Sequence, residues 1–227
     1  MEPTAHSELP AFLRGCGVRD ATLERLAELE PFLEQLREAN AHLNLTRLTS
    51  DADFWIKHVA DSLAVGLAAP ELLTQPLRVA DVGCGAGFPA IPLAWANPGL
   101  RLTAIEARPR KAEFVESAAR ALGLVNLQVL ARQAREVGRL PDHAGAYDAV
   151  LLRAVGPPES LIRECRGLLK PAAGARLVFY LTPTMVAESR SLVNREAHKF
   201  GLKVAESAPV ELPEGAGARQ FLLLARP

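Results

Sequence analysis

Three alternate glycines mark the part of the sequence best suited to chemistry. They stand in Ala80-Asp81-Val82-Gly83-Cys84-Gly85-Ala86-Gly87-Phe88-Pro89, between a run of strand-forming residues and a predicted helix. Glycine lets the backbone turn sharply and approach a ligand closely, and the first N–H groups of the helix face the same space. Phe88 stands where dinucleotide-binding loops carry their third glycine, so the sequence disfavours an NAD site. The small apolar neighbours of Cys84 indicate a packed cysteine rather than a nucleophile.

A carboxylate complements this loop. Glu106 lies 23 residues after Gly83, at the end of the next predicted strand, where it can accept both hydroxyls of a bound ribose. The order Asp81-x-Gly83-x-Gly85-x-Gly87 resembles motif I of S-adenosylmethionine-dependent methyltransferases. That cofactor has no pyrophosphate, so we expect the loop to pack on its amino-acid and sugar parts. The alternative, an ordinary tight turn between strand and helix, is disfavoured by the presence of Glu106.

A second pair of reactive side chains lies upstream. His58 and Asp61 are three residues apart, so on a helix they share one face and both can point into a pocket. A metal site is not expected, because the chain supplies no further His or Cys at suitable spacing. From spacing alone, a capping or hydrogen-bonded core pair is the favoured interpretation.

Seven short runs of strand formers must position these residues. They alternate with helical segments up to the fifth strand, which predicts an α/β fold with a mostly parallel seven-stranded sheet and helices on both faces. The loop Pro213–Gly217 is too short for a crossover helix, so the last two strands are expected to form an antiparallel pair at one edge. The predicted strands are 77–82, 102–106, 127–130, 147–153, 176–181, 204–210 and 220–225, and the helices between the first five are 89–97, 109–122, 135–137 and 158–169.

The residues before the first strand follow a helical pattern. Leucines recur on one stripe from Ala21 to Leu36, a polar break follows at 40–46, and Ser50 or Asp51 can cap a second helix that carries Phe54 to Val65. We therefore predict a helical N-terminal extension over residues 1–70 and a catalytic domain over 71–227.

Charge is divided unevenly between these two parts. The 227 residues carry 26 Lys+Arg and 26 Asp+Glu, but residues 1–76 have a net charge of −6 and the rest +6. The balanced total disfavours polybasic binding of nucleic acid and leaves a local basic face open. Three distant cysteines exclude a disulfide framework. The absence of a leader-like or long apolar segment predicts a cytoplasmic protein without a membrane partner.

The chain resembles the bacterial 16S ribosomal RNA guanine-N7 methyltransferases known as RsmG or GidB. The likeness extends from about Asn44 to the C-terminus. It is carried by Asn44-Leu45-Thr46 with Lys57-His58-Val-Ala-Asp61-Ser62-Leu63, by Gly83-Cys-Gly-Ala-Gly-Phe88-Pro89 with Pro92-Leu93, and by Arg153-Ala154-Val155. The resemblance implies a Rossmann-like class I methyltransferase fold. It also implies S-adenosylmethionine as cofactor, S-adenosylhomocysteine as product and 16S rRNA as partner, within the small subunit or an assembly intermediate; we expect a monomer.

The resemblance also assigns roles to residues. Positioning in the methionine or guanine pocket is expected of His58, Asp61 and Arg153. Cofactor contacts are expected at Asp81, Gly83, Gly85, Gly87, Phe88, Glu106, Ala107, Arg108, Ala134, Arg135 and Arg153. Their charge and position, rather than the resemblance, make Arg108, Arg110, Lys111, Arg139 and Arg219 candidates for RNA contacts; the alternative for each is a solvated surface charge. Two departures from the family pattern are Gln133-Ala134-Arg135 in place of Arg-Ala-Glu, and Tyr180-Leu181-Thr182 where a Lys-Gly pair is common.

The expected chemistry needs alignment more than proton transfer. Guanine N7 keeps an in-plane lone pair and attacks without losing a proton, and positioning can supply up to about 7–11 kcal/mol of barrier reduction. The Asn/Asp-Pro-Pro-aromatic motif of amino-group methylation is absent after Arg153, and Cys165 falls inside the following helix rather than at the strand end. Two alternatives remain at this point: a small-molecule or protein methyltransferase on the same scaffold, and a non-catalytic ribosome-assembly factor that binds the cofactor.

Overall fold

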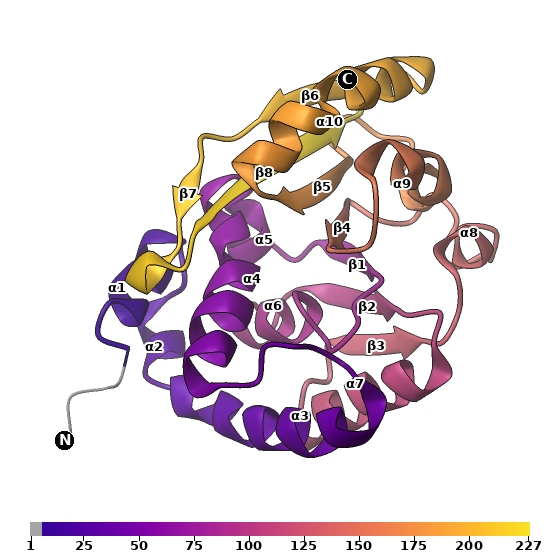
Figure 1. The fold of residues 1–227 in the computed structure, drawn as a ribbon. Coiled ribbons are helices and arrows are strands. Elements are labelled where there is room, and N and C mark those ends of the chain that lie inside the picture. The colour runs from indigo at the N-terminus through magenta and orange to yellow at the C-terminus, as the bar shows by residue number, and fades with distance from the viewer. Residues whose placement is uncertain (1–5) are drawn as a thin grey trace.

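A mixed β-sheet runs through the centre of the molecule (Figure 1). The computed structural model describes residues 6–227. Five strands are parallel in the order β3-β2-β1-β4-β5. β8 follows β5 and is antiparallel to both of its neighbours, β5 and β6, and the short β7 pairs with the start of β8. The strands are β1 (Arg78–Val82), β2 (Arg101–Ile105), β3 (Leu127–Leu130), β4 (Ala149–Arg153), β5 (Arg176–Leu181), β6 (Lys203–Glu206), β7 (Val210–Glu211) and β8 (Ala218–Ala225).

This arrangement confirms the predicted fold class, with two corrections. The expected single strand 204–210 is wrong: it is split into β6 and β7, because Pro209 has no N–H for a ladder and the Ser207 hydroxyl, not a backbone carbonyl, accepts from the N–H of Phe221 (2.9 Å). The fourth strand begins at Ala149, and Tyr147 makes only an isolated bridge. The antiparallel pair of β6 and β8 is confirmed, with β8 inside the sheet between β5 and β6.

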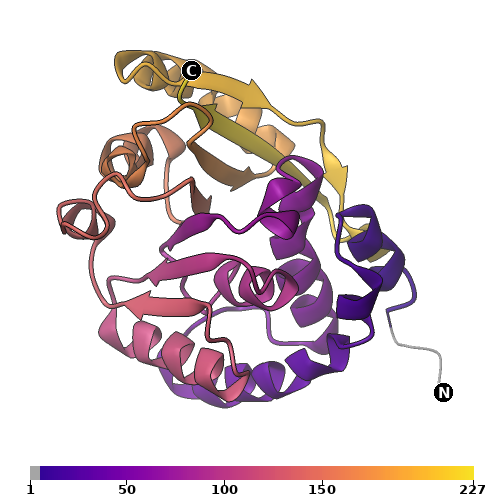
Figure 2. The ribbon, with the colours of Figure 1, turned by 180° about the vertical axis from the view of Figure 1, so that it is seen from behind.

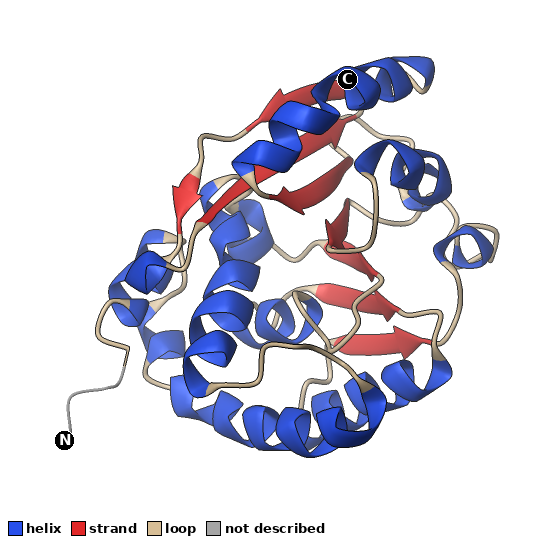
Figure 3. Cartoon of the chain, in the orientation of Figure 1, coloured by secondary structure: helices blue, strands red, loops and turns tan. Residues whose placement is uncertain are grey.

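Helices cover both faces of the sheet (Figures 2 and 3). One face carries α6 (Ala90–Ala96), α7 (Pro109–Ala121) and the N-terminal elements α1 (Leu9–Gly15), α2 (Asp20–Leu23), η1 (Leu26–Leu29), α3 (Glu30–Leu43), η2 (Asp53–Ala60), α4 (Asp61–Leu63), η3 (Ala64–Leu67) and α5 (Glu71–Thr74). The other carries α8 (Ala134–Val137), α9 (Pro158–Cys165), η4 (Arg166–Leu168) and α10 (Pro183–Lys199). A turn, η5 (Pro213–Gly215), precedes β8.

Alternate strand residues supply the two cores. Along β5, Val178 and Tyr180 pack with the N-terminal helices, whereas Leu177 and Phe179 pack with the helices of the opposite face. This period of two is what a strand buried on both sides requires. The sheet therefore stays rigid beneath the loops at the ends of its parallel strands.

The N-terminal helices share a core with the sheet. The ring of Phe32 on α3 lies 5.1 Å from that of Phe88 and 6.2 Å from that of Phe114 on α7. The stripe predicted from Ala21 is helical but divided into α2, η1 and α3. The start of the predicted polar break is wrong, since α3 continues to Leu43. Residues 1–5 of the predicted extension lie outside the described residues, and the boundary at residue 70 stays a prediction.

No helix in the described range is long and apolar enough to cross a membrane.

Candidate functional site

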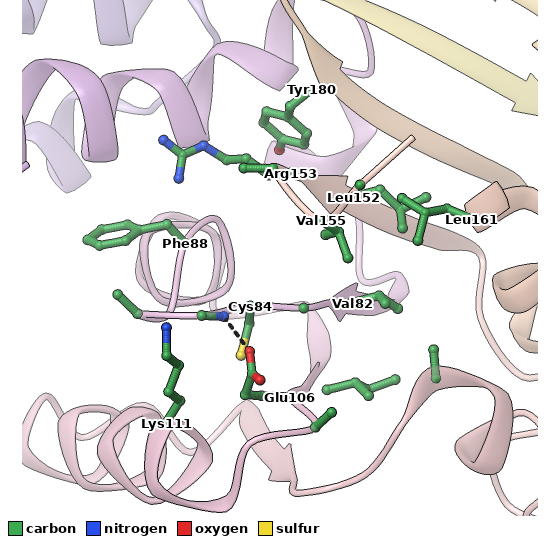
Figure 4. Close-up of a pocket in the computed structure, with 18 of the residues that line it drawn as sticks. Val82, Cys84, Phe88, Glu106, Lys111, Leu152, Arg153, Val155, Leu161 and Tyr180 are labelled. Atoms are coloured by element: carbon green, nitrogen blue, oxygen red, sulfur yellow. Dashed lines mark hydrogen bonds between the residues drawn. The ribbon is translucent and has the colours of Figure 1, made fainter. Parts of the chain in front are cut away.

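A cavity of about 860 Å³ opens at the carboxyl ends of the parallel strands (Figure 4). Its wall comes from the loops after β1, β2, β3, β4 and β5, from residues 45–48 and from His58 on η2. Open α/β sheets bind their ligands at this edge, and the volume lies in the range of small-molecule sites, about 300–1,000 Å³. The strand order places residues far apart in sequence around one space.

The glycine loop after β1 forms a cradle without side chains. Gly83, Gly85 and Gly87 all have positive φ, at 69°, 56° and 96°. A Cβ on Gly83 would lie 2.9 Å from both Cγ atoms of Val155, and a Cβ on Gly85 would meet nothing closer than 3.8 Å. Gly83 and Gly85 line the cavity, whereas Gly87 packs beside Ile91. Gly83 and Gly85 therefore present backbone to the cavity, and the Val155 methyl groups cover one side of Gly83.

Glu106 joins this loop to the end of β2. Its Oε2 accepts from the N–H of Gly85 at 3.1 Å, and its Oε1 accepts from the N–H of Arg108 at 2.9 Å (Figure 4). The carboxylate is buried and lines the cavity, and each oxygen keeps a lone pair for a ligand. Two fixed acceptors beside an open glycine cradle fit the ribose of S-adenosylmethionine. Ala107, Arg108 and Ala134 line the same cavity.

Asp81, the first residue of the glycine motif, does not line the cavity. Its Oδ2 accepts from the N–H of Ala90 at 3.0 Å, at the start of α6, and its Oδ1 has no partner among the described residues. Burial raises the pKa of Asp81 to about 7. Asp81 therefore ties the end of β1 to the start of α6, and its expected contact with the cofactor stays a prediction.

His58 is a neutral wall of the cavity. Its ring stacks on Phe88 with centroids 4.3 Å apart and planes 10° apart. Nε2 lies 3.1 Å from the carbonyl oxygen of Leu48, which can only accept, so we assign the hydrogen to Nε2. Burial, reinforced by the charge of Arg153, lowers the pKa of His58 to about 4. The imidazole is therefore uncharged near pH 7.

Asp61 holds two arginines from distant strands. Its Oδ2 accepts from Nε of Arg153 at 2.7 Å and from Nη2 of Arg219 at 2.9 Å, and its Oδ1 accepts from Nε of Arg219 at 2.5 Å. Arg153 also donates to the carbonyl of Lys57 at 2.6 Å. Both arginines line the cavity, whereas Asp61 is completely buried and does not. Asp61 thus reaches the cavity only through the guanidinium groups that it orients.

The other predicted cations are divided between wall and surface. Arg108 and Lys111 line the cavity, and Lys111 donates from Nζ to the carbonyl of Asn44 at 3.2 Å. Exposed positions outside the cavity are occupied by Arg110, Arg135 and Arg139. Roles for all of them in binding cofactor or RNA stay predictions.

Sequence reasoning missed several wall residues: Leu48, Val155 as a side chain, Tyr180 and Met185. Tyr180, at the place where the family often carries lysine, is buried and donates its hydroxyl to the carbonyl of Ser62 at 3.2 Å. The sequence Ala154-Val155-Gly156 could have indicated Val155 as a wall residue, because its glycine marks an irregular turn directly after β4.

The cysteines are unsuited to nucleophilic attack. Burial raises the pKa of Cys16 and Cys165 to about 12 and that of Cys84 well above its ordinary value. Cys165 lies in the helix after β4 and not at the strand end, as predicted, and it is the last residue of α9. Among residues 6–227, no cluster of three potential metal-ligating side chains occurs.

The fold and the cavity define the class of protein. A solved SAM-dependent methyltransferase from Aquifex aeolicus superposes with a TM-score of 0.56 at 18% identity, covering 80% of this chain and 96% of its own. The protein thus has the α/β fold of SAM-dependent methyltransferases. The family model GidB, rRNA small subunit methyltransferase G, matches residues 25–192, and this chain belongs to that family of SAM-dependent rRNA methyltransferases.

Full-length relatives agree with this family. The chain is 34% identical to Ribosomal RNA small subunit methyltransferase G of Deinococcus deserti, over 99% of this chain and 89% of that protein. It is 38% identical to the protein of the same name from Solibacter usitatus, over 90% of each chain.

Proposed function

We propose that this protein transfers a methyl group from S-adenosylmethionine to N7 of a guanine in the 16S rRNA of the small ribosomal subunit, leaving S-adenosylhomocysteine. The match to the GidB model over residues 25–192 carries the proposal. The cavity at the carboxyl ends of the strands supports it, because it combines a glycine cradle, a ribose acceptor and a wall of fixed cations.

The residues on the β1–β3 side would hold the cofactor. Glu106 would accept the two ribose hydroxyls, while the backbone at Gly83 and Gly85 would lie against the sugar and amino-acid parts. Ala107 and Ala134 would border the adenine. When bound, S-adenosylmethionine supplies a methyl group already activated by its sulfonium sulfur.

The residues on the β4–β5 side suit a reaction without proton abstraction. His58 is neutral and donates its Nε2 hydrogen to Leu48, and the Asp61 carboxylate is occupied by Arg153 and Arg219. N7 of guanine needs no base, so these groups can align the reactants while the buried walls exclude water. Rigid positioning is the catalytic contribution that this arrangement can make.

The test is methyl transfer from labelled S-adenosylmethionine to small subunits that lack the modification, and to naked 16S rRNA. Label should enter the rRNA and should map to 7-methylguanine by reduction and aniline cleavage. Label at another atom would refute the N7 assignment. Cofactor binding without label in either substrate would refute enzymatic activity in favour of an assembly role. A monomer in the cytoplasm remains our prediction.

A further inference from the structure

The two halves of the cavity differ in chemistry. The strand order puts Glu106 after β2 and the glycine loop after β1, and it puts Val155 after β4 and Met185 after β5. Because the proposed ribose acceptor lies on the β2 side, the remaining half, over β4 and β5, is left for the methyl acceptor. The side chains that line this half determine which surface of the methyl acceptor can pack against them.

Two exposed apolar side chains border this half. Val155 is 37% exposed and Met185 is 42% exposed, and both line the cavity. The other large apolar side chains that are exposed within residues 6–227 lie outside it, and they are Leu67, Val125 and Leu192. Apolar groups gathered at a mouth rimmed by cations indicate a contact with an apolar molecular face.

The backbone before Val155 is strained. Ala154 has φ 55°, a left-handed conformation that residues other than glycine, asparagine and aspartate rarely adopt. This conformation follows directly on Arg153, the last residue of β4, and both Val155 methyl groups lie against Gly83. Strain of this kind persists where the surrounding structure requires it, and here it fixes a stiff β-branched side chain beside the cofactor cradle.

We propose that Val155 is the apolar wall on which the ring face of the target guanine rests while N7 faces the cofactor, with Met185 as a second exposed apolar residue of the same cavity. This inference rests on the proposed function. The N7 edge is inaccessible in the deep groove of an RNA duplex, so the base must leave its stack and its two apolar ring faces need new contacts. Val155 supplies one of these contacts, and the left-handed backbone at Ala154 fixes the position of the Val155 side chain against Gly83.

The test compares Val155→Thr and Ala154→Gly with Leu192→Thr, an exposed control on α10. Val155→Thr keeps the shape but replaces a methyl group with a hydroxyl, and we expect kcat/KM on small subunits to fall about tenfold. Ala154→Gly keeps the valine but frees its backbone, so kcat/KM should fall while Tm is unchanged or raised. Calorimetric affinity for S-adenosylmethionine should stay within twofold for both, and Leu192→Thr should match the wild type.

The outcomes separate this inference from the proposed function. If the wild type forms no 7-methylguanine, the proposed function is wrong. If the wild type is active and Val155→Thr equals it, only the inference is wrong. A loss of cofactor affinity as large as the loss of kcat/KM would also overturn the inference, because Val155 would then serve the cofactor and not the base.

Discussion

Asp61→Asn should be among the most destabilising single changes in this protein. The carboxylate is fully buried and accepts three hydrogen bonds from Arg153 and Arg219, whose side chains are only 15% and 19% exposed. Removing the charge leaves two guanidinium groups facing each other with no counter-ion, and breaking a buried ion pair from one side costs about 3–5 kcal/mol. At about 2–4 °C per kcal/mol for a chain of this size, Tm should fall by about 6–20 °C.

The assay is thermal and urea unfolding near pH 7, with Asp20→Asn as a matched control. Asp20 pairs with Arg14 at 2.8 Å on the surface, where its side chain is 70% exposed, so its loss should cost at most about 1 kcal/mol. Arg219→Met in the Asp61→Asn background should recover part of the stability, because one uncompensated charge is removed. Equal losses for Asp61→Asn and Asp20→Asn, or no recovery in the double variant, would refute the reasoning.

Three further predictions concern the cavity. Glu106→Gln should weaken S-adenosylmethionine binding about tenfold or more by calorimetry, since the ribose would lose a charged acceptor worth about 1.5–3 kcal/mol, and unchanged affinity would refute the ribose assignment. Gly83→Ala should reduce cofactor affinity more than Gly123→Ala, because both have φ between 66° and 69° but only Gly83 would place its Cβ 2.9 Å from a neighbour; equal affinities would contradict the cradle. The pKa of His58 is lowered to about 4 in the folded protein, so burying the neutral ring costs nothing above pH 6.5 and becomes unfavourable as the pH falls toward 4. The free energy of unfolding should therefore fall by up to about 3 kcal/mol more between pH 6.5 and 4 in the wild type than in His58→Asn. Parallel pH profiles of the two proteins would show that the ring is not buried in its neutral form.

The sequence predicted the parallel sheet well because its strands are short, apolar and separated by helices. It missed α10, whose Thr182 cap and Pro183 start were visible signals, since that helix is mostly exposed and its apolar stripe is weak. It also predicted too long a strand before Val210, because local strand propensity does not reveal where a ladder partner ends.

Short-range sequence patterns predicted the site residues more readily than the residues with which they form hydrogen bonds. The alternate glycines and Glu106 lie within about 25 residues of each other in the sequence. In the structure the N–H of Gly85 donates a hydrogen bond to Glu106. The contacts of Asp61 with Arg153 and Arg219 join positions 92 and 158 residues apart, so no periodicity could indicate them. The left-handed Ala154 was equally hidden, because alanine carries no sequence signal for positive φ.

The packing of Phe32 on Phe88 and Phe114 also determines when the N-terminal core can form during translation. Phe88 follows Phe32 by 56 residues in the chain. At translation rates of about 5–20 residues per second, Phe88 is made roughly 3–11 s after Phe32, whereas Phe54, whose ring centroid lies 5.7 Å from that of Phe32, is made before Phe88. During that interval the apolar stripe of α3 can pack only with other N-terminal residues such as Phe54. The N-terminal helices of this protein, although made first, therefore complete their core only after the glycine loop and α7 have been synthesised.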